Sequence, residues 1–247
     1  MFSFFGRKSK KLDEIIDLSV VGTDLHSHLI PGVDDGSQSF EESISLLKQL
    51  KELGYKKVIT TPHIYYDSYL DGYDVLYNKL EELRSLAKEN VIDIEIILGG
   101  EFLLDDDISD RVKKNQIISF GDNYLLFEFP MQTEPMGYEE WLFDLQLAGY
   151  NLIMAHPERY SFLNKDIKKY SALKDRGILF QINIASFSGY YGERIQKIAE
   201  SMAAENMIDL IGSDCHGQRH IEALKKSLDN PVFKKLINSG RLLNHKL

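Results

Sequence analysis

Seven short runs of largely apolar, often β-branched residues recur along this 247-residue chain, separated by stretches with helical periodicity. The runs cover residues 19–23, 57–60, 94–98, 124–127, 152–155, 179–182 and 208–211. Nearly continuous apolar runs of this length are typical of strands buried on both faces. Helices are predicted over residues 40–53, 73–88, 139–148, 167–174, 193–204, 221–228 and 232–238. This alternation predicts parallel β-α units and therefore an α/β fold.

Two α/β architectures are compatible with this alternation. The sequence contains no linker, repeat or change in composition, so a closed barrel of about seven parallel strands fits its length. An open, doubly wound sheet is the alternative, and such a sheet usually carries a glycine-rich nucleotide-binding turn. Neither a G-x-G-x-x-G nor a P-loop pattern occurs. We therefore expect a single barrel domain over residues 19–247, preceded by an N-terminal extension over residues 1–18.

Charge and composition exclude several classes of protein. Lys and Arg total 29 against 38 Asp and Glu, and this net charge of -9 argues against general nucleic-acid binding. No apolar run approaches the ~20 residues that a membrane-spanning helix requires. Cys215 is the only cysteine, which excludes an internal disulfide and fits a reducing cytoplasm.

The first residues combine aromatic and basic side chains. An apolar start over residues 2–5 precedes a basic run over residues 7–11, the reverse of the order in a signal peptide. We expect a solvated terminus that leads into a short helix over residues 11–17. Weak contact with an anionic membrane surface is the alternative interpretation.

Histidines and acidic residues follow the predicted strands at the points where the strands end. Five of the seven histidines stand there, namely His26, His28, His63, His156 and His216. The acidic residues at these places are Asp34, Asp35, Glu101, Glu128 and Asp214. In parallel barrels the active site forms from the loops at this end of the strands. We therefore expect these side chains to share one site.

The residue types at these strand ends are metal ligands. Imidazoles and carboxylates together suit borderline-to-hard divalent metals such as Mn, Fe or Zn. His26 and His28 are two residues apart, so in an extended segment they point to the same side and can bind one ion. A carboxylate can bridge two ions, a role open to Glu101 or Glu128. There are more candidate ligands than one ion needs, which implies two or three ions.

Other catalytic patterns are incomplete. Cys215 lacks the arginine of a cysteine phosphatase loop, because Ile221 stands at that position. We interpret this cysteine as a small buried residue between two ligands. The acidic run over residues 105–107 is interpreted as the solvated start of a helix, and no G-x-S-x-G nucleophile turn is present.

The ordered motifs resemble the PHP (polymerase and histidinol phosphatase) family, and within it the tyrosine phosphatases of bacterial capsule and exopolysaccharide operons, the CpsB/YwqE type. They are Asp24-Leu25-His26-Ser27-His28, Val33-Asp34-Asp35-Gly36, Thr61-Pro62-His63, Gly100-Glu101, Glu128-Phe129, His156-Pro157-Glu158-Arg159-Tyr160 and Ser213-Asp214-Cys215-His216. The Asp-Asp-Gly and His-Pro-Glu-Arg-Tyr segments favour the tyrosine phosphatase branch. The resemblance implies a distorted (β/α)7 barrel, with a trinuclear metal site that we expect at its C-terminal rim.

The resemblance also implies a role for each matched residue. One ion would be held by His26, His28, Glu101 and Asp214. A second ion would be held by Glu101, Glu128 and His156. A third would be held by Asp35, His63 and His216. Arg159 and Arg219 match arginines near the bound phosphate, although Arg219 lies one residue closer to the last motif than in some relatives.

The implied function is metal-dependent hydrolysis of protein phosphotyrosine in the cytoplasm. The expected metal is Mn, with Fe or Zn as alternatives, and the implied partner is a bacterial tyrosine autokinase that governs polysaccharide export. A phosphatase of histidinol phosphate or another small molecule is the alternative enzyme, and a metal-bound regulatory partner without turnover is the non-catalytic alternative. The tyrosines of the predicted rim either flank a phosphoaryl group or pack the loops on the barrel. They are Tyr65, Tyr66, Tyr69, Tyr190 and Tyr191.

Overall fold

The computed structural model describes residues 17–65, 68–69, 72–164 and 167–247. The helix predicted over residues 11–17 and the N-terminal extension lie outside the described residues, except for Asp17 and Leu18. These two residues begin a short 3-10 turn, η1 (Leu18–Val20), in which the Asp17 side chain accepts a hydrogen bond from the backbone N–H of Ser19 at 3.0 Å.

All paired strands of the described residues run parallel to one another, in two sheets. One sheet contains β1 (Thr23–Asp24), β2 (Lys57–Thr60) and β4 (Glu95–Leu98), in that order. The other has the order β3 (His63–Ile64), β5 (Glu101–Leu103), β6 (Tyr124–Glu128), β7 (Asn151–Ala155), β8 (Leu179–Asn183) and β9 (Leu210–Gly212).

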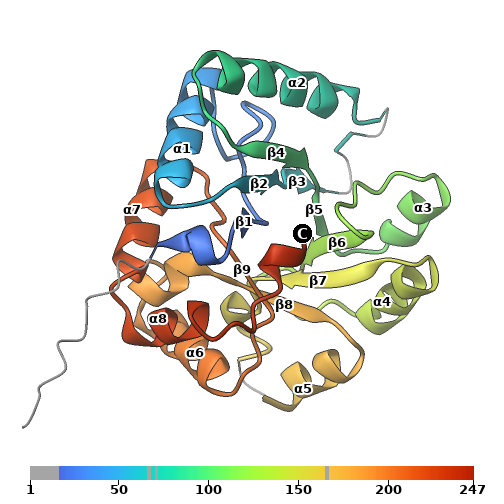
Figure 1. Ribbon diagram of the computed structural model, residues 1–247. Coiled ribbons are helices and arrows are strands. Elements are labelled where there is room, and N and C mark those ends of the chain that lie inside the picture. Colours follow the sequence, from blue (N-terminus) through green and yellow to red (C-terminus); the bar gives the residue numbers. More distant parts are fainter. Residues whose placement is uncertain (1–16, 66–67, 70–71, 165–166) are drawn as a thin grey trace, which may run out of the picture.

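Backbone hydrogen bonds join the two sheets into a ring. β2 is followed at once by β3, and β4 by β5, with two-residue breaks at 61–62 and 99–100. At these breaks Gly99 donates to Thr60 at 2.8 Å and Glu101 donates to Pro62 at 3.0 Å. A parallel bridge between Ser27 and Cys215 connects the segments that follow β1 and β9. Seven strand positions therefore succeed one another around the distorted (β/α)7 barrel that the sequence predicted (Figure 1).

The predicted first strand over residues 19–23 is wrong at its start. The chain there forms η1, and the strand is reduced to Thr23 and Asp24. Asp17 caps the turn, and Gly22 then reverses the direction of the backbone with a positive φ of 77°. The last strand also begins two residues later than predicted, at Leu210, and the short strands β3 and β5 were not predicted.

The helices lie outside the ring of strands (Figure 1). They are α1 (Phe40–Glu52), α2 (Asp74–Glu89), α3 (Ile108–Lys113), α4 (Tyr138–Leu147), α5 (Ile167–Asp175), α6 (Glu193–Ala204), α7 (Gln218–Ser227) and α8 (Pro231–Ile237). Ser39 caps α1 by accepting from the Glu42 N–H, and the buried face of this helix includes Ile44, Leu47 and Leu50, as predicted. α3 begins directly after the acidic run 105–107, also as predicted.

A small core fills the inside of the ring, separate from the large core shared with the helices. It contains Leu25, Ile59, Leu126, Ile153 and Leu210, and Leu247 of the C-terminal segment packs on it. The turn before this leucine, η4 (Asn244–Lys246), lies over the middle of the ring in Figure 1. The buried Asn244 side chain there donates to the carbonyls of Thr23 and Ile211 at 3.0 and 2.7 Å. One end of the ring is thus closed by apolar packing, and the polar residues gather at the other end.

Candidate metal centre

The structure brings all nine predicted ligands together at the carboxyl ends of the strands. Their side chains form four overlapping groups in which the ligand atoms lie within 4.8 Å of one another. The groups are His28, Asp35, His63 and His216; His26, His28 and Asp214; His26, Glu101 and His156; and His63, Glu101 and Glu128. Because the groups share members, the nine residues form one continuous cluster rather than separate sites.

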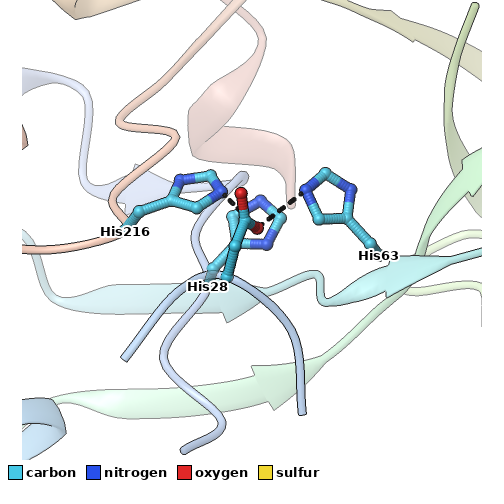
Figure 2. A group of neighbouring side chains, drawn as sticks. His28, His63 and His216 are labelled. Atoms are coloured by element: carbon cyan, nitrogen blue, oxygen red, sulfur yellow. Dashed lines mark ion pairs between the residues drawn. The ribbon is translucent and has the colours of Figure 1, made fainter. Parts of the chain in front are cut away.

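Three imidazoles lie together on the side of the cluster that contains Asp35. Figure 2 shows His28, His63 and His216 turned towards one another, with ion pairs drawn as dashed lines. The Asp35 Oδ1 atom lies 3.3 Å from Nε2 of His63 and 3.3 Å from Nε2 of His216. The Asp35 side chain is 75% exposed, so this part of the cluster is open to solvent.

Glu101 lies at the centre of the cluster and is fully buried. Its Oε2 atom is 3.2 Å from Nε2 of His26, 3.4 Å from Nε2 of His28 and 3.1 Å from Nδ1 of His63. Its Oε1 atom is 2.9 Å from Nε2 of His156. One carboxylate therefore faces imidazoles on both of its oxygens, which is the arrangement expected of a ligand that bridges two ions.

The donor atoms of the cluster fit divalent metal ions. Oε2 of Glu101 and Nδ1 of His63 are buried without a hydrogen-bond partner, although ligand atoms surround both. Leaving buried polar atoms unpaired is unfavourable, and a bound cation would satisfy these atoms. The set contains imidazoles and carboxylates and no thiolate, a combination that suits Mn, Fe or Zn.

The ionisation of the cluster in the metal-free protein follows from the same contacts. Burial acts to lower the pKa of His26, but the charges of Glu101 and Asp214 outweigh it and raise that pKa above its usual value. The carboxylates of Glu101 and Glu128, which lie 3.1 and 3.4 Å from His63 Nδ1, similarly overcome burial and raise the pKa of His63 to about 10. The pKa of Glu101 is held well below its usual range, because nearby imidazoles overcome the effect of its burial. Without metal, the charged His63 imidazole therefore lies between the carboxylates of Glu101 and Glu128.

A second layer of polar side chains orients the ligands, and Asp34 is one member. Its Oδ2 atom lies 2.8 Å from Nδ1 of His28, whereas Asp35, the adjacent residue, faces His63 and His216. Burial raises the pKa of Asp34, but the contact with His28 dominates and lowers that pKa to about 2. A Cβ atom on Gly36 would lie 2.3 Å from the carbonyl oxygen of His28, so this turn admits only glycine.

Two buried residues of β8 form another part of this layer, and the sequence did not identify them. Gln181 Oε1 lies 2.8 Å from Nδ1 of His26, and Gln181 Nε2 donates to Oδ1 of Asn183 at 2.9 Å. Asn183 Nδ2 donates in turn to Oδ2 of Asp214 at 2.6 Å. The available signal was the polar Gln181 inside an apolar run, with a polar residue two positions later on the same face.

Two ligands are presented by unusual backbone conformations. His156 and Asp214 have φ values of 35° and 49°, in the left-handed region that residues other than glycine rarely adopt. Such conformations persist only where the surrounding structure holds them, and they are concentrated at functional sites. Cys215 follows Asp214 and is fully buried. Burial raises the pKa of its thiol, which agrees with a packing role.

Arg159 lies above the ligands at the end of the turn η2 (Pro157–Arg159). Its Nη1 atom donates to Oδ2 of Asp214 at 3.2 Å, and its guanidinium carbon lies 4.5 Å from the centre of the Tyr191 ring. These contacts hold a positive charge beside the cluster, where it can meet an anion bound there.

A cavity of about 520 Å³ opens above the cluster, and Tyr65, Arg159, Tyr190, Tyr191 and His220 contribute to its walls. Tyr65 also lines an adjoining groove of about 580 Å³ that contains Tyr69, while Tyr66 lies outside the described residues. Arg219, the other predicted phosphate-binding arginine, is exposed and does not line the cavity. Its assigned role stays a prediction. Burial lowers the pKa of His220, its neighbour in the cavity wall, to about 4.

Known proteins resemble this chain over most of its length. CapC of Staphylococcus aureus is 31% identical over 208 residues, which cover 84% of this chain and 82% of CapC. The tyrosine-protein phosphatase YwqE of Bacillus subtilis is 27% identical over 229 residues, covering 89% of this chain and 90% of YwqE. The tyrosine-protein phosphatase CpsB of Streptococcus pneumoniae is 29% identical over 199 residues, covering 78% of this chain and 82% of CpsB.

Solved structures of related proteins also resemble this chain. A crystal structure from work on YwqE and CpsB, described as metal-dependent tyrosine phosphatases, superposes with a TM-score of 0.78 and 25% identity. The match covers 91% of this chain and 94% of that one. A histidinol phosphate phosphatase of Lactococcus lactis shares the fold at a TM-score of 0.53 and 15% identity, over 89% of this chain and 93% of that one. Residues 22–236 match the family described as capsular polysaccharide synthesis, CpsB/CapC, and the chain belongs to that family.

Proposed function

We propose that this protein is a metal-dependent phosphatase that hydrolyses phosphotyrosine in proteins. The observation that carries the proposal is the position of the Arg159 guanidinium beside nine convergent metal ligands, in the wall of an open cavity. Two relatives that match most of the chain, YwqE and CpsB, are tyrosine-protein phosphatases. Both the chemistry of the cluster and these relatives support hydrolysis of a phosphate monoester.

The bound ions and Arg159 would have different roles in the reaction. Bound divalent ions would supply hydroxide, by lowering the pKa of a bound water towards ~7, and would withdraw charge from the phosphate. Arg159 binds the phosphate with the planar fork of its guanidinium, a geometry that matches two phosphate oxygens. A tyrosine leaving group has an unperturbed pKa near 10, so it needs less help from a proton donor than an alkoxide.

The distribution of ligands among ions is part of the proposal. We assign one ion to His26, His28, Glu101 and Asp214, a second to Glu101, Glu128 and His156, and a third to Asp35, His63 and His216. The first assignment is supported by Oδ1 of Asp214, which lies 3.3 Å from His26 Nε2 and 3.4 Å from His28 Nε2. The third is supported by Asp35, which faces both of its imidazoles.

Mn is our choice of metal, with Fe and Zn as the competitors. The set is rich in carboxylates, which suit Mn. Zn binds such sites more tightly in general, so a purified sample can carry an ion other than the physiological one.

The proposed substrate protein is a bacterial tyrosine autokinase that governs polysaccharide export. The family description, capsular polysaccharide synthesis, supports this context. A cytoplasmic location belongs to the same proposal and agrees with the single reduced cysteine. None of the described helices combines the length and apolar character that crossing a membrane requires. Contact of the N-terminal aromatic and basic residues with an anionic membrane surface would bring the enzyme near a membrane-bound kinase, and those residues lie outside the described part.

Turnover on a phosphotyrosine peptide and on histidinol phosphate, measured with one Mn-loaded preparation, tests the proposal. We expect the higher kcat/KM on the peptide and complete loss of activity with a chelator. Higher activity on histidinol phosphate would instead assign the protein to small-molecule phosphatases. Metal binding without turnover on either compound would favour a regulatory partner.

A further inference from the structure

The first turn of α7 determines which side chain of this helix lines the cavity that Arg159 also lines. Successive residues of a helix point about 100° apart, so neighbouring residues cannot share a direction. Arg219 is exposed, Ile221 is fully buried in the core, and His220, between them, lines the cavity. The helix therefore presents an imidazole, and not a guanidinium, to the space above the ligands.

The contacts of His220 fix the ring and leave one nitrogen available. The Nδ1 atom accepts a hydrogen bond from the backbone N–H of His216 at 3.4 Å. A neutral imidazole that accepts at Nδ1 carries its proton on Nε2. Nε2 has no hydrogen-bond partner among the described residues. The ring thus offers one N–H donor in the wall of the cavity.

A series of ring contacts links His220 to Arg159. The His220 ring centre lies 4.9 Å from that of Tyr190, and Tyr190 meets Tyr191 edge-on at 4.9 Å. Tyr191 in turn lies beneath the Arg159 guanidinium. The two donors are therefore held on one continuous wall, and side-chain packing limits the movement of both.

We propose that His220 is a second phosphate-binding residue, whose Nε2–H donates to a phosphate oxygen that Arg159 does not bind. The inference rests on the proposed phosphatase function and names a further residue of the same site. A phosphomonoester has three non-bridging oxygens, and a planar guanidinium matches two of them. His220 fills the role that resemblance assigned to Arg219.

Two substitutions of His220 separate phosphate binding from support of His216. In His220→Asn the side-chain oxygen can still accept from the His216 N–H, but the distal donor is lost. In His220→Gln the longer side chain can place an N–H near the former Nε2 position. Arg219→Ala tests the alternative that Arg219 binds the phosphate. Lys226→Ala removes another exposed charge from the same helix and serves as the control.

The probe is inorganic phosphate, titrated calorimetrically into Mn-loaded protein, together with metal content for each variant. We expect His220→Asn to weaken phosphate binding about five- to tenfold at unchanged metal content, the effect of one lost hydrogen bond. His220→Gln should recover part of the affinity, and Arg219→Ala should bind like the Lys226→Ala control.

Two outcomes would overturn the inference. Phosphate affinity that falls in Arg219→Ala and is unchanged in His220→Asn would return the role to the arginine. Loss of metal from His220→Asn would show that the imidazole only supports His216. Since phosphate binding needs no turnover, a wild-type protein that binds phosphate through His220 without hydrolysing phosphotyrosine would refute the proposed function and leave this inference standing.

Discussion

Gln181 Oε1 lies 2.8 Å from Nδ1 of His26, and both side chains are fully buried. The amide oxygen can only accept, so His26 donates its Nδ1–H to Gln181 and turns Nε2 towards Glu101 and Asp214, where a bound metal ion would replace the proton on Nε2. A metal-ligating histidine usually donates its second N–H in this way, and the partner fixes both the tautomer and the ring orientation.

Replacement of this partner should weaken metal binding. Gln181→Leu keeps the approximate size of the side chain and removes its oxygen, so we expect metal affinity to fall about 10- to 100-fold. Competition with a fluorescent chelator measures the change. Gln146→Leu, on the exposed face of α4, is the matched control. Equal metal affinity in both variants would contradict an orienting role for Gln181.

Loss of the central carboxylate should remove more than one ion. Glu101→Gln leaves a side chain of the same shape that cannot bridge two cations, and elemental analysis should show a loss of at least two ions per chain. Asp35→Asn should have a smaller effect, because Asp35 contacts only His63 and His216 and lies at the edge of the cluster, with its side chain 75% exposed. A fully active wild-type sample with at most one ion per chain would refute a multinuclear centre.

Metal uptake should release protons and weaken at low pH. The pKa of His63 is raised to about 10 in the metal-free protein, so this imidazole is charged at pH 7. A ligating imidazole must be neutral, whereas the pKa of Glu101 is lowered and its carboxylate needs no deprotonation. Calorimetry in buffers of different ionisation enthalpy should detect the released protons. Affinity that stays constant between pH 6 and 8, without proton release, would rule out this coupling.

The sequence predicted the barrel and the shared site because both depend on spacing. Parallel strands place residues that follow them on one rim, so His63 and His156 could be expected together although more than 90 residues separate them. Spacing alone could not show which residues Asp34 and Asp35 contact, because adjacent carboxylates differ only in the direction of their side chains. The fold directs Asp34 to His28 and Asp35 to His63 and His216.

The remaining features of the site depend on helix boundaries and distant contacts that the sequence did not define. α7 begins at Gln218 rather than at residue 221, so the directions of Arg219 and His220 could not be derived from the expected helix. Gln181 and Asn183 are the polar residues of the strand β8, and the partner of Gln181, His26, lies 155 positions earlier in the chain. A pattern in the local sequence can mark a buried polar residue, but it cannot identify a partner so far away in the chain.

Removal of the guanidinium should reduce catalysis without removing metal. Arg159→Ala should lower kcat/KM on a phosphotyrosine peptide about 10- to 100-fold, the effect of one or two lost charge-assisted hydrogen bonds. Arg159→Lys keeps the charge but not the planar fork and should lie between wild type and alanine. Arg194→Ala, at an exposed position on α6, controls for loss of charge. Unchanged kinetics in Arg159→Ala would make this arginine a surface ion-pair residue.

Selectivity for an aryl phosphate should come from the tyrosines around the cavity. The bound metal ions and Arg159 would contact only the phosphate, which is the same in every monoester. Tyr65 stacks on His63 with ring centres 5.1 Å apart and remains 41% exposed, and Tyr190, which lines the same cavity, is 42% exposed. Both rings are therefore available to a substrate ring, and one stacking pair contributes about 0.5–1.5 kcal/mol.

Tyr65→Ala and Tyr190→Ala should each raise KM for a phosphotyrosine peptide about two- to tenfold, the range given by one lost stacking pair. Tyr65→Phe and Tyr190→Phe keep the rings and should retain the wild-type KM. Inorganic phosphate has no ring, so its affinity should not change in Tyr65→Ala or in either phenylalanine variant. Tyr190→Ala removes the ring that packs on His220 and should therefore weaken phosphate binding as well. Wild type should in addition show a higher kcat/KM on the phosphotyrosine peptide than on a phosphoserine peptide or histidinol phosphate. A tenfold preference for histidinol phosphate would move the assignment to a small-molecule phosphatase. Equal losses of phosphate and peptide affinity in Tyr65→Ala would mean that this tyrosine supports its loop instead of binding the substrate ring.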